Sequence, residues 1–228
     1  MKKKMLKFLA GVLISCTLAG SAVSVQAEDN LEMQVTSYLT GEDVPESVGR
    51  RRPIAVMLGN DTNGAPQSGT GNAGVIYEAP VEGGITRLMA VIEDYDNLQR
   101  IGSVRSCRDY YIDWALEFDA IYVHYGQAVY AYDLLNSDMV NNISGLQYQD
   151  SVGELNGYAG EDVFFRTSDR VAPHNCYTSG EGILKGIEKK EYSMELDNDY
   201  TGHFKFAARS EEHTSELQSL EDLVCRLL

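Results

Sequence analysis

Three arginines, Arg100, Arg105 and Arg108, lie just before and at the start of a predicted helix, in a chain that is otherwise strongly acidic. Guanidinium groups bind carboxylates and phosphates in a bidentate manner, so these side chains could hold an anionic ligand together with backbone N–H groups of the first helical turn. Cations at this end of a helix oppose its dipole, which calls for a compensating negative charge. Arg87, in the preceding predicted strand, is the fourth arginine of this candidate ligand-binding group.

The same arginines also have a purely structural interpretation. Ion pairs within the protein would neutralise them equally well, because structural ion pairs perturb the same residue types as binding sites do. The carboxylates that could serve are Glu78, Glu82, Asp109 and Asp113. Both interpretations stay open at this level.

Groups that could act as a catalytic acid or base are few. Glu78 and Glu82 lie on either side of Pro80, and paired carboxylates can serve hydrolysis, although in an acidic chain they are equally typical of a solvated surface. His174 could carry a proton near neutral pH. No grouping of His, Cys and carboxylates has the spacing of metal ligands, so we predict no structural metal and no cofactor.

The charge balance excludes some classes of partner. The chain carries a formal net charge of −15, and its central part stays strongly acidic when the two ends are set aside. Such a surface repels nucleic acid and anionic lipid. We therefore expect no nucleic-acid partner.

The N-terminus predicts export from the cytoplasm. Lysines within the first seven residues precede an apolar run over residues 8–25, which is typical of a secretory signal peptide over residues 1–27 with cleavage after Ala27. The run Leu13-Ile14-Ser15-Cys16 also fits a lipobox, in which the signal would end at residue 15 and Cys16 would be lipidated. Because the apolar run continues past Cys16, we favour the first site. Both place the folded part outside the cytoplasm, either secreted or anchored to the outer face of the membrane.

The C-terminus has an unusual composition. Residues 209–219 read RSEEHTSELQS, which resembles the in-frame translation of a sequencing adapter. An amphipathic helix is the alternative, since Leu217, Leu220, Val224 and Leu227 recur at helical spacing. We interpret residues 209–228 as an artefactual tail and expect the natural chain to continue beyond Ala208.

Between these ends, the pattern alternates between strands and helices. Residues 28–51 are acidic and show no sustained period, which indicates a flexible stem, and a single domain is expected over residues 52–208. Short apolar runs predict strands at 54–58, 75–77, 85–92, 120–125 and 163–166. Amphipathic spacing predicts helices at 109–118, 127–136 and 183–190, the last with a capping box from Thr178 to Glu181.

This alternation predicts an α/β fold, with mixed α+β as the variant. We expect a two-layer or three-layer domain of sheet and helix with at least one parallel strand pair. The crossover connection is assigned to the strands at 85–92 and 120–125.

Five segments together resemble one known family, the YerB-like family of uncharacterised bacterial lipoproteins, over about residues 52–185. They read RPIAVM (52–57), YEAPVEGGITR (77–87), IGSVRS (101–106), DAIYVH (119–124) and PHN (173–175). The resemblance implies an extracytoplasmic, often lipid-anchored protein whose N-terminal domain is followed by a second domain.

Cys107 and Cys176 depart from the family pattern, in which small or apolar residues are more usual. Two such departures suggest a disulfide between them, with two unpaired buried thiols as the alternative. A bond would bring their α-carbons within about 7 Å. It would also place Arg105 and Arg108 beside His174 and Asn175, which makes the last two candidate ligand-binding residues.

Two functions follow from these observations. The first is a non-enzymatic envelope module that binds an anionic ligand, such as a wall glycan, a lipid-linked phosphate or a carboxylate, or a partner protein. The alternative is an enzyme acting on a phosphorylated glycan or polyprenyl-phosphate substrate, with Glu78 or His174 as base. Residues 87–109 loosely resemble wall-polymer ligases of the LytR-CpsA-Psr type, which hold a pyrophosphate with arginines.

Overall fold

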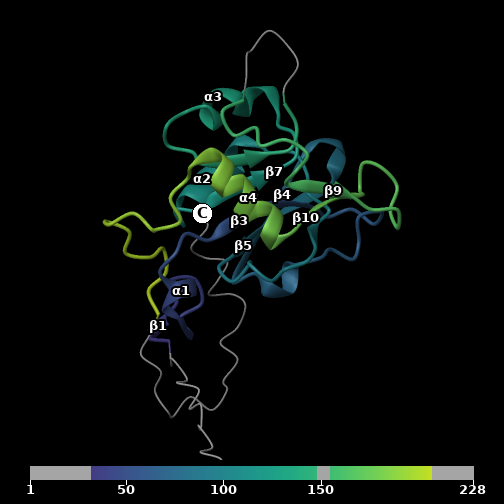
Figure 1. Cartoon of the computed structure of the whole chain (residues 1–228). Helices are drawn as coiled ribbons and strands as arrows, with labels where there is room; N and C mark the ends of the chain where they lie inside the picture. Colours follow the sequence, from purple (N-terminus) through teal and green to yellow (C-terminus); the bar gives the residue numbers. More distant parts are fainter. Residues whose placement is uncertain (1–31, 148–154, 207–228) are drawn as a thin grey trace, which may run out of the picture. The chain divides into compact units, whose positions relative to one another are not determined.

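A computed structural model describes residues 32–147 and 155–206 of the chain (Figure 1). At its centre is a five-stranded sheet with the order β4-β5-β3-β7-β8. Its strands are β3 (Ile54–Gly59), β4 (Val75–Pro80), β5 (Thr86–Ile92), β7 (Ile121–His124) and β8 (Asn142–Ser144). The pairs β4-β5 and β5-β3 are antiparallel, whereas β3-β7 and β7-β8 are parallel. The mixed α/β class and the presence of a parallel pair are thereby confirmed.

The predicted position of the parallel pair is wrong. β5 lies between β4 and β3 and is antiparallel to both, while β7 pairs with β3, so that Ala55 faces Val91 on one side and Tyr122 on the other. Apolar runs identify strands but carry no information about which strand they pair with. The order of the strands along the chain therefore did not predict which two strands form the parallel pair.

The central sheet is buried on both faces, which gives three layers. Alternate residues of β3 point to opposite sides, so Met57 belongs to one core cluster and Val56 to the other. The first face is covered by α2 (Asp109–Leu116), η3 (Val129–Ala131) and α3 (Tyr132–Leu135). The second is covered by α4 (Gly180–Lys190) and by a small antiparallel sheet of β6 (Ile101–Gly102), β10 (Cys176–Thr178) and β9 (Phe164–Arg166).

The prediction of a flexible stem over residues 28–51 is wrong for residues 32–51. They form β1 (Gln34–Thr36), β2 (Asp43–Pro45) and α1 (Glu46–Gly49), and β1 pairs with β2. The turn between these strands is fixed to the domain, because Ser37 Oγ donates a 2.7 Å hydrogen bond to Glu93 and Leu39 is buried. Elements this short have too few residues to show a period.

The predicted helices are only partly confirmed. α2 and α4 match their predictions to within a few residues, but residues 127–136 form a 3-10 turn followed by the short α3. The cap of α4 is Ser179, whose Oγ accepts from the N–H of Gly182 at 3.1 Å, rather than Thr178. Thr178 Oγ1 instead donates to the carbonyl of Val163. Two further 3-10 helices are η1 (Thr70–Asn72) and η2 (Glu82–Gly84).

The predicted signal peptide, the lipidation candidate Cys16 and the adapter-like residues 209–219 lie outside the described residues. Within the described part, no helix combines the length and the apolar character needed to cross a membrane.

Candidate anion-binding site

The arginine segment, residues 104–108, runs in extended form past the ends of several strands. The N–H of Val104 donates to the carbonyl of Cys176 at 2.8 Å, and the N–H of Arg105 donates to Met57 at 2.9 Å. The N–H of Cys107 then donates to Gly126 at 2.9 Å. These bonds tie the segment to β3, β10 and the turn after β7, so side chains from all three regions meet beside it.

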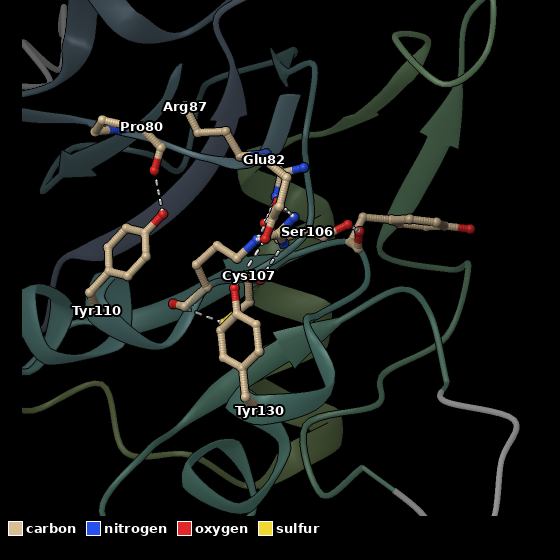
Figure 2. Close-up of polar contacts among 9 residues, drawn as sticks. Pro80, Glu82, Arg87, Ser106, Cys107, Tyr110 and Tyr130 are labelled. Atoms are coloured by element: carbon tan, nitrogen blue, oxygen red, sulfur yellow. Dashed lines mark hydrogen bonds and ion pairs between the residues drawn. The ribbon is translucent and has the colours of Figure 1, made fainter. Parts of the chain in front are cut away.

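Arg108 is neutralised within the protein. Its Nε lies 2.8 and 3.0 Å from the two carboxylate oxygens of Glu82, and Nη2 forms a further short contact with the same group. Tyr130 also donates to Glu82, with its hydroxyl 3.1 Å from Oε1 (Figure 2). These hydrogen bonds, that from Arg108 first, lower the pKa of Glu82 to about 2. For Arg108, the interpretation as a structural ion pair holds.

Arg100 is also occupied. Its Nη2 lies 2.9 Å from Oδ2 of Asp169, and its guanidinium carbon lies 3.9 Å from the ring centroid of Tyr177. An ion pair on one side and an aromatic face on the other satisfy this cation locally. Arg100 is absent from the lining of the described cavities around the arginine segment.

Arg87 is buried beneath the arginine segment and supports it. Its Nη1 donates to the carbonyl of Ser106 (Figure 2). Burial, together with the nearby charges of Arg108 and Arg105, lowers the pKa of Arg87 to about 10. Because the side chain is only 7 % exposed, its role is to position residues 105–108 rather than to meet a ligand.

Arg105 differs from the other three arginines because it lines a cavity. Its Nη1 donates to the carbonyl of Pro173 at 3.0 Å, and among the described residues its side chain forms no other hydrogen bond and no ion pair. The cavity has a volume of about 240 Å³. Its lining residues are Val104, Arg105, Ser106, Tyr125, Leu146, Arg166, Pro173 and Cys176.

Arg166 supplies a second guanidinium to the same cavity. It ends β9, where it pairs in register with Cys176 of β10. Its Nη1 donates to Oδ1 of Asn175 at 2.9 Å, and its guanidinium carbon lies 5.1 Å from the ring centroid of Tyr125. The amide and the aromatic ring orient the side chain without neutralising its charge.

Neither of these two arginines forms an ion pair with a carboxylate in the part of the chain that the structure describes. No carboxylate oxygen there lies within 4.0 Å of Arg105 or of Arg166. In a chain with a net charge of −15, two unpaired guanidiniums on one cavity are an arrangement suited to holding an anion by paired N–H donors.

A second cavity of about 180 Å³ adjoins the first. The two share Tyr125, Arg166 and Cys176, and the second is completed by Glu161, Phe164 and Phe165. The side chain of Tyr125 donates to Oε1 of Glu161 at 3.3 Å. Arg105 lines the first cavity but not the second, and the carboxylate of Glu161 lines the second but not the first.

The predicted disulfide is wrong, because Cys107 and Cys176 are both free thiols. Cys107 packs in the core on the α2 face of the sheet and Cys176 in the core on the α4 face. The neighbourhood that the bond was expected to create is present in part: backbone hydrogen bonds and the contact of Arg105 with Pro173 join the two segments, whereas Arg108 pairs with Glu82 instead.

The remaining candidate residues are not among the residues that line the two cavities. His174 Nδ1 is 3.2 Å from Oδ2 of Asp61, and Asn175 reaches the site only through Arg166. Glu78 accepts from Asn60 and from Thr86. Within the described ranges, no group of three or more His, Cys, Asp or Glu residues is placed to hold a metal ion.

Sequence reasoning missed Arg166, Tyr125 and Glu161. Arg166 follows two phenylalanines in a short run that predicts a strand, and nothing local indicates that its neighbour across the sheet is Cys176. Only the pairing of β9 with β10 and of β10 with the arginine segment brings it to Arg105. Local charge pattern does not single out Arg166 either, because Asp162 and Asp169 lie at i−4 and i+3 from it.

Comparison with known proteins identifies relatives. A family model described as "Protein of unknown function (DUF3048) N-terminal domain" matches residues 39–193. A Bacillus subtilis (strain 168) protein named "Putative lipoprotein YerB" is 33% identical over 178 residues, which are 77% of this chain and 50% of that protein. A crystal structure of the YerB protein from Bacillus subtilis matches with a TM-score of 0.62 and 32% identity, covering 72% of this chain and 52% of the other. The chain thus spans about half the length of these relatives.

Proposed function

Since the chain belongs to the family described as the DUF3048 N-terminal domain, whose function is unknown, we propose a function from the cavity that Arg105 and Arg166 line. The chain is an extracytoplasmic module that binds a small phosphate-bearing anion between these two arginines. The Bacillus subtilis relative named "Putative lipoprotein YerB" supports a location in the cell envelope. A lipid anchor on Cys16 would hold the module at the outer face of the membrane.

One observation carries this proposal: two guanidiniums without a carboxylate partner in the described residues line the same cavity. A tetrahedral anion offers several oxygen acceptors, and two arginine side chains can bind it in a bidentate manner. We favour binding over catalysis because Glu78 and His174, the predicted bases, are absent from the cavity lining.

Isothermal titration calorimetry of the purified protein with methyl phosphate tests the proposal. Removing one charge-assisted hydrogen-bonding partner costs about 1.5–3 kcal/mol, or roughly 10-fold to 100-fold in affinity. Arg105→Ala and Arg166→Ala should each show this loss. Arg100→Ala is the matched control, since Arg100 is paired with Asp169, and its affinity should stay within about twofold.

The melting temperature of each variant separates lost binding from lost folding. A wild-type protein that releases no binding heat with methyl phosphate would overturn the proposal. So would an Arg105→Ala variant that is folded and binds as tightly as the wild type.

A further inference from the structure

The two adjoining cavities together form a pocket whose charged groups restrict the ligand. Tyr125, Arg166 and Cys176 line both cavities. Arg105 lines the first cavity but not the second, and Glu161 lines the second but not the first. A ligand that occupies both cavities therefore meets two cations and a carboxylate.

Glu161 has spare capacity to accept hydrogen bonds. Its side chain is exposed, and its one recorded side-chain hydrogen bond in the described part of the chain is the long contact of 3.3 Å from Tyr125. A carboxylate can accept about four hydrogen bonds. This part of the pocket thus favours hydroxyl donors and repels a second anionic group.

The walls of the pocket are apolar and aromatic. The rings of Tyr125 and Phe164 pack edge to face with centroids 5.4 Å apart, and both line the second cavity. Val104, Leu146 and Pro173 line the first. Such walls suit the C–H faces of a small polyhydroxylated ring, whose hydroxyl groups remain free to reach the polar groups of the pocket.

The size of the pocket limits the length of the ligand. The cavities measure about 240 and 180 Å³ and share three lining residues, so together they lie near the lower end of the range of about 300–1,000 Å³ for pockets that hold drug-sized ligands. This space suits one sugar unit with its phosphate, rather than several sugars in a row.

Building on the proposed function, we propose that the pocket recognises a phosphorylated monosaccharide unit, with its phosphate between Arg105 and Arg166 and its hydroxyl groups directed toward Glu161. The unit could be a free sugar phosphate or part of a phosphodiester-linked glycan. Both present the same phosphate and hydroxyl chemistry to the site.

Calorimetric titrations with methyl phosphate and glucose 1-phosphate test this inference. For the wild type, glucose 1-phosphate should bind at least about 10-fold more tightly, because hydrogen bonds to the charged carboxylate are added. In Glu161→Ala, the ratio of the two affinities should fall to within about threefold, while methyl phosphate binds no more weakly than before. Asp162→Ala removes the same charge from the adjacent residue and should leave the ratio unchanged.

The outcomes separate this inference from the proposed function. Equal affinities for methyl phosphate and glucose 1-phosphate would overturn sugar recognition and leave anion binding in place. No binding of either compound would overturn both. A larger gain with O-phosphoethanolamine than with glucose 1-phosphate would overturn hydroxyl recognition, since an ammonium group would then be the partner of Glu161. Tighter binding of methyl glucosyl phosphate, a diester, than of the monoester would assign the unit to a glycan chain.

Discussion

Arg105 and Arg166 line the same cavity of about 240 Å³, although one lies in the extended segment before α2 and the other at the end of β9. The pairing of β9 with β10 and the hydrogen bond from Val104 to Cys176 of β10 bring the two residues to the same cavity. Arg100 and Arg108 differ from them, because each forms an ion pair with a carboxylate of the protein.

Substitution of Arg166 by lysine tests whether the paired N–H donors of its guanidinium contribute to phosphate affinity in addition to its charge. Arg166→Lys keeps one positive charge but cannot present two parallel N–H donors. We expect the affinity for methyl phosphate to fall about tenfold, as loss of one hydrogen bond predicts. Calorimetry at two salt concentrations checks this result. An affinity equal to that of the wild type would show that charge alone suffices.

The ion pair of Glu82 with Arg108 predicts a pH-dependent contribution to stability. The pKa of Glu82 is lowered from 4.5 to about 2 in the folded protein, so the stabilisation is fully present above pH 4.5 and is lost as the pH falls toward 2. Because the Glu82 side chain is 61% exposed, we expect Glu82→Gln to cost only about 0.2–1 kcal/mol at pH 7.

Urea denaturation of the wild type and Glu82→Gln at pH 7, 4 and 3 measures this difference. It should shrink steadily as the pH is lowered. A difference that stays constant from pH 7 to pH 3 would show that the pair does not stabilise the fold through the ionised carboxylate.

Arg87 should contribute more to stability than any exposed arginine. Arg87→Ala removes the donor to the Ser106 carbonyl and empties space beneath the arginine segment, and we expect a loss of about 1–3 kcal/mol in the free energy of unfolding. Arg100→Ala, which breaks an exposed ion pair, should cost about 0–1 kcal/mol. Urea unfolding of both variants gives the comparison, and equal losses would contradict the supporting role of Arg87.

The two thiols should react slowly and at different rates. Burial raises the pKa of Cys107 to about 12 and that of Cys176 to about 11, and the thiolate is the form that reacts. At pH 8, we expect iodoacetamide to label Cys176 before Cys107 in the folded protein, and both at similar rates in urea. Peptide mass mapping measures the two rates. Equal rates in the folded state, or a disulfide-linked peptide containing both residues, would contradict this prediction.

Local sequence patterns identified most of the main elements because the signals are local. The five central strands include four that were predicted from short apolar runs, and the β-strand at 142–144 was missed since three residues in a glycine-rich region show no pattern. Helix α4 was anticipated from its spacing and polar cap. These elements depend on neighbouring residues, which is the information that a single sequence carries best.

The candidate site was harder to predict from the sequence, because its residues are far apart along the chain. Arg105 was found from its setting before a helix, yet it could not be distinguished from Arg108 until the ion pair of Arg108 with Glu82 was seen. Arg166 and Glu161 reach the pocket through strand pairing that no local pattern encodes. The disulfide prediction was wrong, and of the two arginines that it placed beside residues 173–175 only Arg105 lies there.

The most direct test of the central claim is a double-mutant cycle on methyl phosphate affinity with Arg105→Ala, Arg166→Ala and the double variant. If both arginines hold one anion, the free-energy losses of the single variants should not add, with an interaction energy of about 0.5–3 kcal/mol. Single variants that each lose affinity, with a non-additive double variant, are the predicted result. Single variants that bind as the wild type does, or strictly additive losses, would contradict the account of one shared anion between Arg105 and Arg166.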